Sequence, residues 1–173
     1  MELRTERLVL RPLCVTDVDT CNEYAMDAET SRYMLFLPNK THEQTLAFLR
    51  GCEAGWAQDP VTAFEFAITL DGRHIGAVSV NREEEAMEMG WILNKAYHGK
   101  GYAYEAARAL MDFAVEVLDA KRIVAHCDTR NAPSYRLMEK LGMRRVGEHD
   151  RVYPDERGTA REYEYEWRRC DAE

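Results

Sequence analysis

The sequence lacks long apolar runs, paired cysteines and an excess of basic residues, and each lack excludes a class of protein. Nowhere do about 18 apolar residues follow one another, so we expect no membrane-spanning segment. The five cysteines include no CxxC pair, which favours reduced thiols in the cytoplasm over a disulfide framework. With only five prolines and ten glycines against 46% hydrophobic residues, the composition indicates a globular protein and neither a disordered nor a collagen-like chain.

The charge balance is acidic, with 23 Lys and Arg against 31 Asp and Glu, which gives a formal net charge of −8. Nucleic acid or an anionic membrane surface would need a basic face, so we expect neither as a partner. A cationic small molecule or a basic peptide fits this charge better. At the N-terminus, charged residues interrupt the apolar ones every two or three positions, which does not fit a signal peptide.

Hydrophobic periodicity, capping boxes and turn residues predict one α+β domain over residues 1–173, with no repeat or linker. Thr16 with Asp19 and Thr41 with Gln44 form capping boxes, and Asp71-Gly72 predicts a hairpin turn. In chain order we expect a strand over 7–13, a helix over 17–27, a loop over 33–39, a helix from about 41 to 55–60, strands over 64–70, 74–81 and 86–93, a helix over 103–119, a strand over 123–127, a helix over 131–141, and strands over 146–151 and 161–168.

Two glycines, Gly99 and Gly101, stand directly before the long predicted helix. Glycines let the backbone approach a ligand closely, and the free N–H groups of a helix start bind anions, phosphate above all. A tight turn without a ligand is the alternative. The known phosphate loops are excluded, because no GxxxxGK[ST] occurs and Tyr104 stands where a dinucleotide fingerprint would need its third glycine.

Four stretches resemble the GCN5-related N-acetyltransferase (GNAT) superfamily in order and spacing: 88–93, 98–103, 131–134 and 139–143. The opening residues 3–13 are similar to its ribosomal-protein-alanine N-acetyltransferase branch. The resemblance implies an acyl-CoA N-acyltransferase fold, with a mixed, mostly antiparallel sheet and about four helices. It also implies transfer of acetyl from acetyl-CoA to a primary amine, on a protein N-terminus or a small molecule, by direct attack in a ternary complex.

The same resemblance implies where the coenzyme binds. In the family, pantetheine bonds to the backbone of a central strand and the pyrophosphate binds the loop before the long helix. The matching positions are Gly90, Trp91, Ile92 and Leu93 for pantetheine, His98, Gly99, Lys100, Gly101, Tyr102 and Ala103 for the pyrophosphate, and Asn131 for a further contact. His98 departs from the family's usual Gln or Arg, which places a side-chain phosphate contact there in doubt.

Glu88 is the candidate base that takes the proton of the attacking ammonium. Both faces of the strand over 86–93 are mostly apolar, so the strand is central and desolvation should raise the pKa of this carboxyl. The family's ribosomal branch has a glutamate in this role. The alternative to a catalytic role is that Glu88 is an ordinary strand residue whose carboxylate is satisfied by a salt bridge or by water. Glu105 is the rival base, but we expect it to form a solvated pair with Arg108.

Ser134 is the candidate acid that protonates the leaving thiolate, as the resemblance to the ribosomal branch implies. Many relatives use a tyrosine at the position of Met138, which cannot donate a proton. Tyr135 and water are the alternatives for the proton donor. The alternative for Asn131 and Ser134 is that they only form the start of a helix.

The acceptor pocket is expected between the first two helices, the loop over 33–38 and the closing hairpin, by analogy with the family. Glu29, Asp155 and Glu156 could attract a cationic amine there, or could be solvated surface. The histidines show no metal-ligand spacing, so we expect no metal. The competing function is a coenzyme-A-binding module without catalysis. The oligomeric state, monomer or homodimer, stays open.

Overall fold

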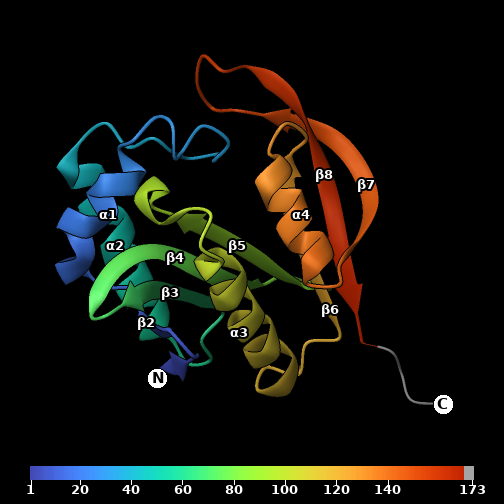
Figure 1. The fold of residues 1–173 in the computed structure, drawn as a ribbon, viewed down its shortest axis with the longest axis horizontal. Coiled ribbons are helices and arrows are strands. Elements are labelled where there is room, and N and C mark those ends of the chain that lie inside the picture. Colours follow the sequence, from blue (N-terminus) through green and yellow to red (C-terminus); the bar gives the residue numbers. More distant parts are fainter. Residues whose placement is uncertain (170–173) are drawn as a thin grey trace.

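The computed structural model describes residues 1–169, which form an α+β fold around one eight-stranded sheet (Figure 1). The strands lie in the order β1-β2-β3-β4-β5-β6-β8-β7, and every neighbouring pair is antiparallel except β5 with β6. The elements are β1 (Leu3–Arg4), β2 (Leu8–Pro12), α1 (Val18–Ala25), α2 (His42–Trp56), β3 (Ala63–Leu70), β4 (Arg73–Arg82), β5 (Met87–Leu93), α3 (Tyr102–Glu116), β6 (Arg122–Asp128), α4 (Ala132–Lys140), β7 (Arg144–Val152) and β8 (Thr159–Arg168).

Local sequence signals account for several of these boundaries. Thr41 Oγ1 accepts a hydrogen bond from the Gln44 amide at 3.2 Å and starts α2, which confirms that capping box. Asp71 and Gly72 both have positive φ, 50° and 80°, and turn the chain from β3 into β4. The box predicted at Thr16 is wrong, because Cys14 and Asp17 cap a short 3₁₀ turn instead and α1 begins only at Val18.

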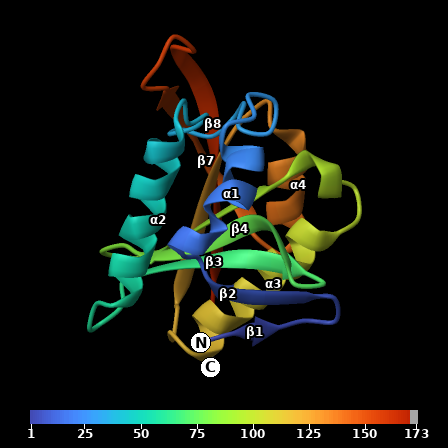
Figure 2. The same ribbon diagram turned by 90° about the vertical axis from the view of Figure 1, so that its left-hand side faces the viewer.

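The sheet has a helix pair on each face, as the side view in Figure 2 shows. Large apolar side chains such as Phe66 and Val80 point to the face covered by α3 and α4. Smaller ones, including Ala67 and Ala77, meet α1 and α2 on the opposite face. Successive strand residues point to opposite faces, so the size of each side chain sets how closely a helix can approach. The face of α1 and α2 therefore keeps more open space.

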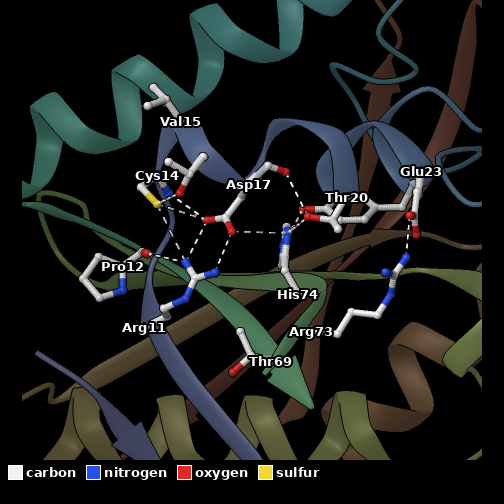
Figure 3. Close-up of polar contacts among 12 residues, drawn as sticks. Arg11, Pro12, Cys14, Val15, Asp17, Thr20, Glu23, Thr69, Arg73 and His74 are labelled. Atoms are coloured by element: carbon white, nitrogen blue, oxygen red, sulfur yellow. Dashed lines mark hydrogen bonds and ion pairs between the residues drawn. The ribbon is translucent and has the colours of Figure 1, made fainter. Parts of the chain in front are cut away.

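A buried polar cluster fixes α1 against the sheet (Figure 3). Arg11 on β2 donates to Asp17 at 2.6 Å and 2.8 Å, and the ring of His74 on β4 lies 2.8 Å from Thr20 Oγ1. His74 also lies 3.3 Å from the hydroxyl of Tyr24, and burial lowers the pKa of its imidazole. The cluster joins β2, β4 and α1, and so sets where α1 borders the open part of this face.

Strands β5 and β6 separate soon after they meet. Their parallel pairing consists of Met87 with Ile123 and Glu88 with Val124, whereas β5 stays paired with β4 along its whole length, up to Leu93. The edge of β5 from Met89 onward therefore faces a V-shaped opening in the middle of the sheet. Backbone N–H and C=O groups along such an edge need other partners.

Candidate active site

The loop before α3 presents unpaired backbone amides. Gly99 and Gly101 have φ of 74° and 83°, the left-handed region, and Gly101 is the residue that precedes the first turn of α3. Within residues 1–169, the amides of 99–104 donate to no acceptor, and the first to do so is Glu105, to the Gly101 carbonyl at 3.0 Å. Converging amides at the positive end of a helix dipole form an anion site.

Arg7 holds this loop in place, a role that the sequence did not reveal. Its guanidinium donates to the Lys100 carbonyl at 3.0 Å and to Glu105 Oε2 at 2.7 Å, and lies 4.5 Å from the centre of the Tyr102 ring. The expected pair of Glu105 with Arg108 is wrong, because Arg108 pairs with Asp112 one helical turn on. The contact of Glu105 with Arg7 spans 98 residues, so no local pattern could signal it.

The ring of His98 contacts the strand that precedes the loop. Its Nε2 lies 2.8 Å from the carbonyl oxygen of Leu93, at the end of β5. The imidazole therefore fixes the connection between β5 and the loop. Lys100, by contrast, is an exposed cation 5.7 Å from the centre of the Tyr97 ring, beside the free amides.

Glu88 lies on the open face of β5 and pairs with His126 on β6. His126 Nδ1 is 2.8 Å from Glu88 Oε1, because Glu88 is in register with Val124 and the next residue on that face is His126. This hydrogen bond lowers the pKa of Glu88 and raises the pKa of His126. The predicted rise in the Glu88 pKa is therefore wrong, since the bond to His126 outweighs desolvation.

Two adjoining cavities, of about 400 and 470 Å³, form a groove across this face of the sheet. We call them together the central groove; they share Leu35, Ser79, Gly90 and Arg151. The first contains the pair of Glu88 with His126, and the second runs beneath α1 and α2 to Glu65 on β3. The loop over 33–38, both early helices and the closing hairpin line the groove, and these are the elements among which the acceptor pocket was expected.

The acidic residues expected in this pocket lie elsewhere. Glu29 pairs with Lys95 at 2.9 Å and Asp155 with Arg157 at 2.7 Å, and neither they nor Glu156 lines the described cavities. Two acids that the sequence did not single out, Glu65 and Glu162, line the groove instead. Both residues belong to strands in which apolar and polar side chains alternate, so the sequence shows that the strand has two faces. Only the packing of the neighbouring elements shows which of these faces borders the groove.

Arg157 anchors the loop that borders the central groove. Its guanidinium lies 4.1 Å from the centre of the Tyr153 ring and donates to four carbonyl oxygens of the loop over 32–37, at 2.8–3.4 Å. This one side chain of the closing hairpin thus supplies the hydrogen-bond donors that the loop carbonyls would otherwise need from backbone amides. Phe36, in the same loop, stays 83% exposed at the groove.

The candidate acid lies on the other side of the sheet. Ser134 is half-buried in the first turn of α4, and the ring of Tyr135 packs edge-on against Tyr163 at 5.7 Å. Asn131 precedes the helix, but its side chain makes no capping hydrogen bond and is free for another contact within the described chain. Met138 is 1% exposed and belongs to the core.

Neither a metal-binding group of three or more His, Cys, Asp or Glu residues nor a helix long and apolar enough to cross a membrane occurs within residues 1–169.

Known proteins resemble this chain in sequence and in fold. Residues 7–144 match the acetyltransferase (GNAT) domain family. The uncharacterized N-acetyltransferase YnaD of Bacillus subtilis is 31% identical over 169 residues, 95% of each chain. The crystal structure of a GNAT-family acetyltransferase from Bacillus anthracis is similar with a TM-score of 0.83 and 31% identity, covering 97% of this chain and 98% of that one. The ribosomal L7/L12 α-N-protein acetyltransferase RimL, in complex with coenzyme A, shares the fold at a TM-score of 0.85 and 17% identity, over 97% and 98% of the two chains.

Proposed function

The chain belongs to the GNAT family and is an acetyl-CoA-dependent acetyltransferase, and on that premise we propose that it acetylates a primary amine by direct attack in a ternary complex. The observation that carries the proposal is the central groove, which brings the pair of Glu88 with His126 beside the opening between β5 and β6. The groove gives the amine a place to bind, and the opening gives the coenzyme access to it from the other face.

We assign the pyrophosphate of acetyl-CoA to the free amides of 99–104, with Lys100 beside them, and its pantetheine to the open edge of β5 from Gly90 to Leu93. Asn131 contributes a further contact from the start of α4. His98 takes part through its backbone and through the contact of its ring with Leu93, since Nε2 is already engaged by that carbonyl.

The base in this mechanism is the pair of Glu88 with His126. A neutral His126 donates Nδ1–H to Glu88, which leaves Nε2 free to take a proton from the amine. The amine nitrogen then attacks the thioester carbon, the carbon–sulfur bond breaks, and the thiolate takes a proton from Ser134, with Tyr135 or water as the alternatives. Burial raises the pKa of the Cys127 thiol to about 11, which argues against a covalent acyl-enzyme.

Glu88→Gln tests the base. Losing the carboxylate should let the pKa of His126 fall towards its ordinary value, so the rate should drop about a hundredfold or more and its rise with pH should move to lower pH. His126→Gln should remove that rise altogether. Coenzyme binding should stay unchanged in both variants. A wild-type pH profile in Glu88→Gln would exclude Glu88 from the base.

Thiol release from acetyl-CoA in the presence of a broad panel of amines tests the activity itself. Release above hydrolysis with at least one amine supports an N-acetyltransferase. No release with any amine, while coenzyme A still binds, would favour the alternative, a coenzyme-binding module without catalysis.

We also propose that residues 1–173 act as one catalytic domain, because β1 and β2 form one edge of the same sheet whose other edge is β7 and β8. The cytoplasm is the compartment we propose, since the four described cysteines are free thiols. Cys170 lies outside the described residues.

A further inference from the structure

Glu65 is an unpaired carboxylate inside the central groove. It lies near the start of β3, and its backbone carbonyl accepts from the Leu13 amide and from Trp56 Nε1, each at 2.9 Å, which fixes the strand there. Its carboxylate oxygens have no hydrogen bond or ion pair with any residue of 1–169, and they border the cavity of about 470 Å³ beneath α1 and α2. An ionised carboxylate in such a place is costly unless a cation joins it.

No neighbour neutralises Glu65. The titratable groups around it are Tyr24, Cys21 and Cys52; burial raises the pKa of all three, that of Cys52 to about 12, so they stay uncharged. Arg151 lies in the same cavity wall, but it is already bound to Glu162 and to a loop carbonyl. Burial alone raises the pKa of Glu65 to about 7, with no opposing cation.

The distance from Glu65 to the reaction centre follows from the sheet register. Glu65 is paired with Ser79, and Ser79 with Gly90, so the three residues form one row across β3, β4 and β5. Neighbouring strands lie about 4.8 Å apart, which places Glu65 about 10 Å from Gly90 at the β5–β6 opening. Ser79 lies between them, and the next row on this face, with Ala77 and Ile92, gives the cavity a mostly apolar wall.

We propose that Glu65 binds a second cationic group of the acceptor, which makes the favoured substrate a diamine whose two nitrogens are joined by a short apolar chain. One nitrogen reaches the acetyl group beside Glu88 while the other, as an ammonium, lies against Glu65. The inference rests on the proposed function, because it assigns the acceptor of the same site.

The test compares cadaverine with pentylamine, which has the same chain and lacks the second amine. Wild-type protein with saturating acetyl-CoA should show a kcat/KM for cadaverine at least about tenfold above that for pentylamine. Glu65→Gln should lower the value for cadaverine by about tenfold to a hundredfold, the usual loss for a charged hydrogen bond, and change pentylamine by less than about twofold. Glu43→Gln, an exposed glutamate on α2, is the matched control and should behave as wild type.

Equal rates with both amines, unchanged by Glu65→Gln, would overturn this inference and leave the acetyltransferase function standing. Absence of thiol release with every amine would instead contradict the proposed function. In that case, calorimetry on the coenzyme-A complex tests whether Glu65 binds the second amine. Equal affinity for cadaverine and pentylamine would overturn the inference. Carbon-13 NMR of the wild-type Glu65 carboxyl gives a readout that needs no variant. Cadaverine should lower its pKa and pentylamine should not; an unmoved titration with bound cadaverine also overturns the inference.

Discussion

Replacing Glu65 with Gln should make the folded protein more stable above neutral pH. The carboxyl ionises at about 7 in the folded chain, against an ordinary value of 4.5. This difference of about 2.5 units corresponds to about 3 kcal/mol at 1.36 kcal/mol per unit, or about 2–3 kcal/mol when water in the cavity screens the charge. The folded state binds the proton more tightly, so the carboxyl destabilises it progressively as pH rises from 4.5 to 7. Gln carries no charge at any pH and escapes this penalty.

Urea unfolding of wild type and Glu65→Gln, without amine, measures the effect at a series of pH values. The variant should be more stable by about 2–3 kcal/mol at pH 8, and the difference should vanish well below pH 4.5, where the carboxyl of wild type is protonated in both the folded and the unfolded state. Glu43→Gln should follow wild type throughout. A difference that does not change with pH, or a wild type more stable than the variant at pH 8, would refute the reasoning. If the variant is more stable but turns over the diamine more slowly, then Glu65 lowers the stability of the fold and improves the binding of the substrate.

Three further predictions concern the coenzyme loop, the groove loop and the proton donor. Gly101→Val should weaken coenzyme A binding about tenfold in calorimetry, because a β-branched residue at φ of 83° is strained by about 1–2 kcal/mol; unchanged affinity would exclude the loop as the anion site. Arg157→Gln should raise the KM for the amine severalfold while the coenzyme affinity stays constant, because the loop over 32–37 loses four hydrogen bonds; an unchanged KM would contradict its positioning role. Ser134→Ala should lower kcat about a hundredfold and Tyr135→Phe far less, and the reverse order in single-turnover rates would assign the donor to Tyr135.

The pattern along the chain was sufficient where a structure depends on a few adjacent residues. The capping box at Thr41, the hairpin at Asp71-Gly72 and the glycine loop before α3 all follow from backbone preferences within one turn. The central place of β5 followed from its two apolar faces. The failed box at Thr16 shows the limit, since Asp17 bonds to Arg11 and a 3₁₀ turn forms instead.

Charged partners could not be predicted in the same way. Glu105 has a suitable neighbour on its own helix, yet it binds Thr5 and Arg7 in the turn between β1 and β2, whose donors converge on one carboxylate. Glu88 was placed correctly on a central strand, but its pKa depends on His126, which arrives through the parallel register of β6. A hydrogen bond from another strand outweighs the desolvation that the local pattern implied.

The sequence by itself therefore indicated the order of the elements and the glycine turn before α3, because these depend on short-range periodicity and turn chemistry, while the family followed from the resemblance of its motifs to the GNAT superfamily. Only the tertiary structure decided which carboxylates meet a cation, and that Glu65, inside the central groove, meets none among residues 1–169. The physical reason is that charge pairing depends on distances of a few ångströms between strands far apart in the chain, and a one-residue change of register would turn every such side chain to the other face of the sheet.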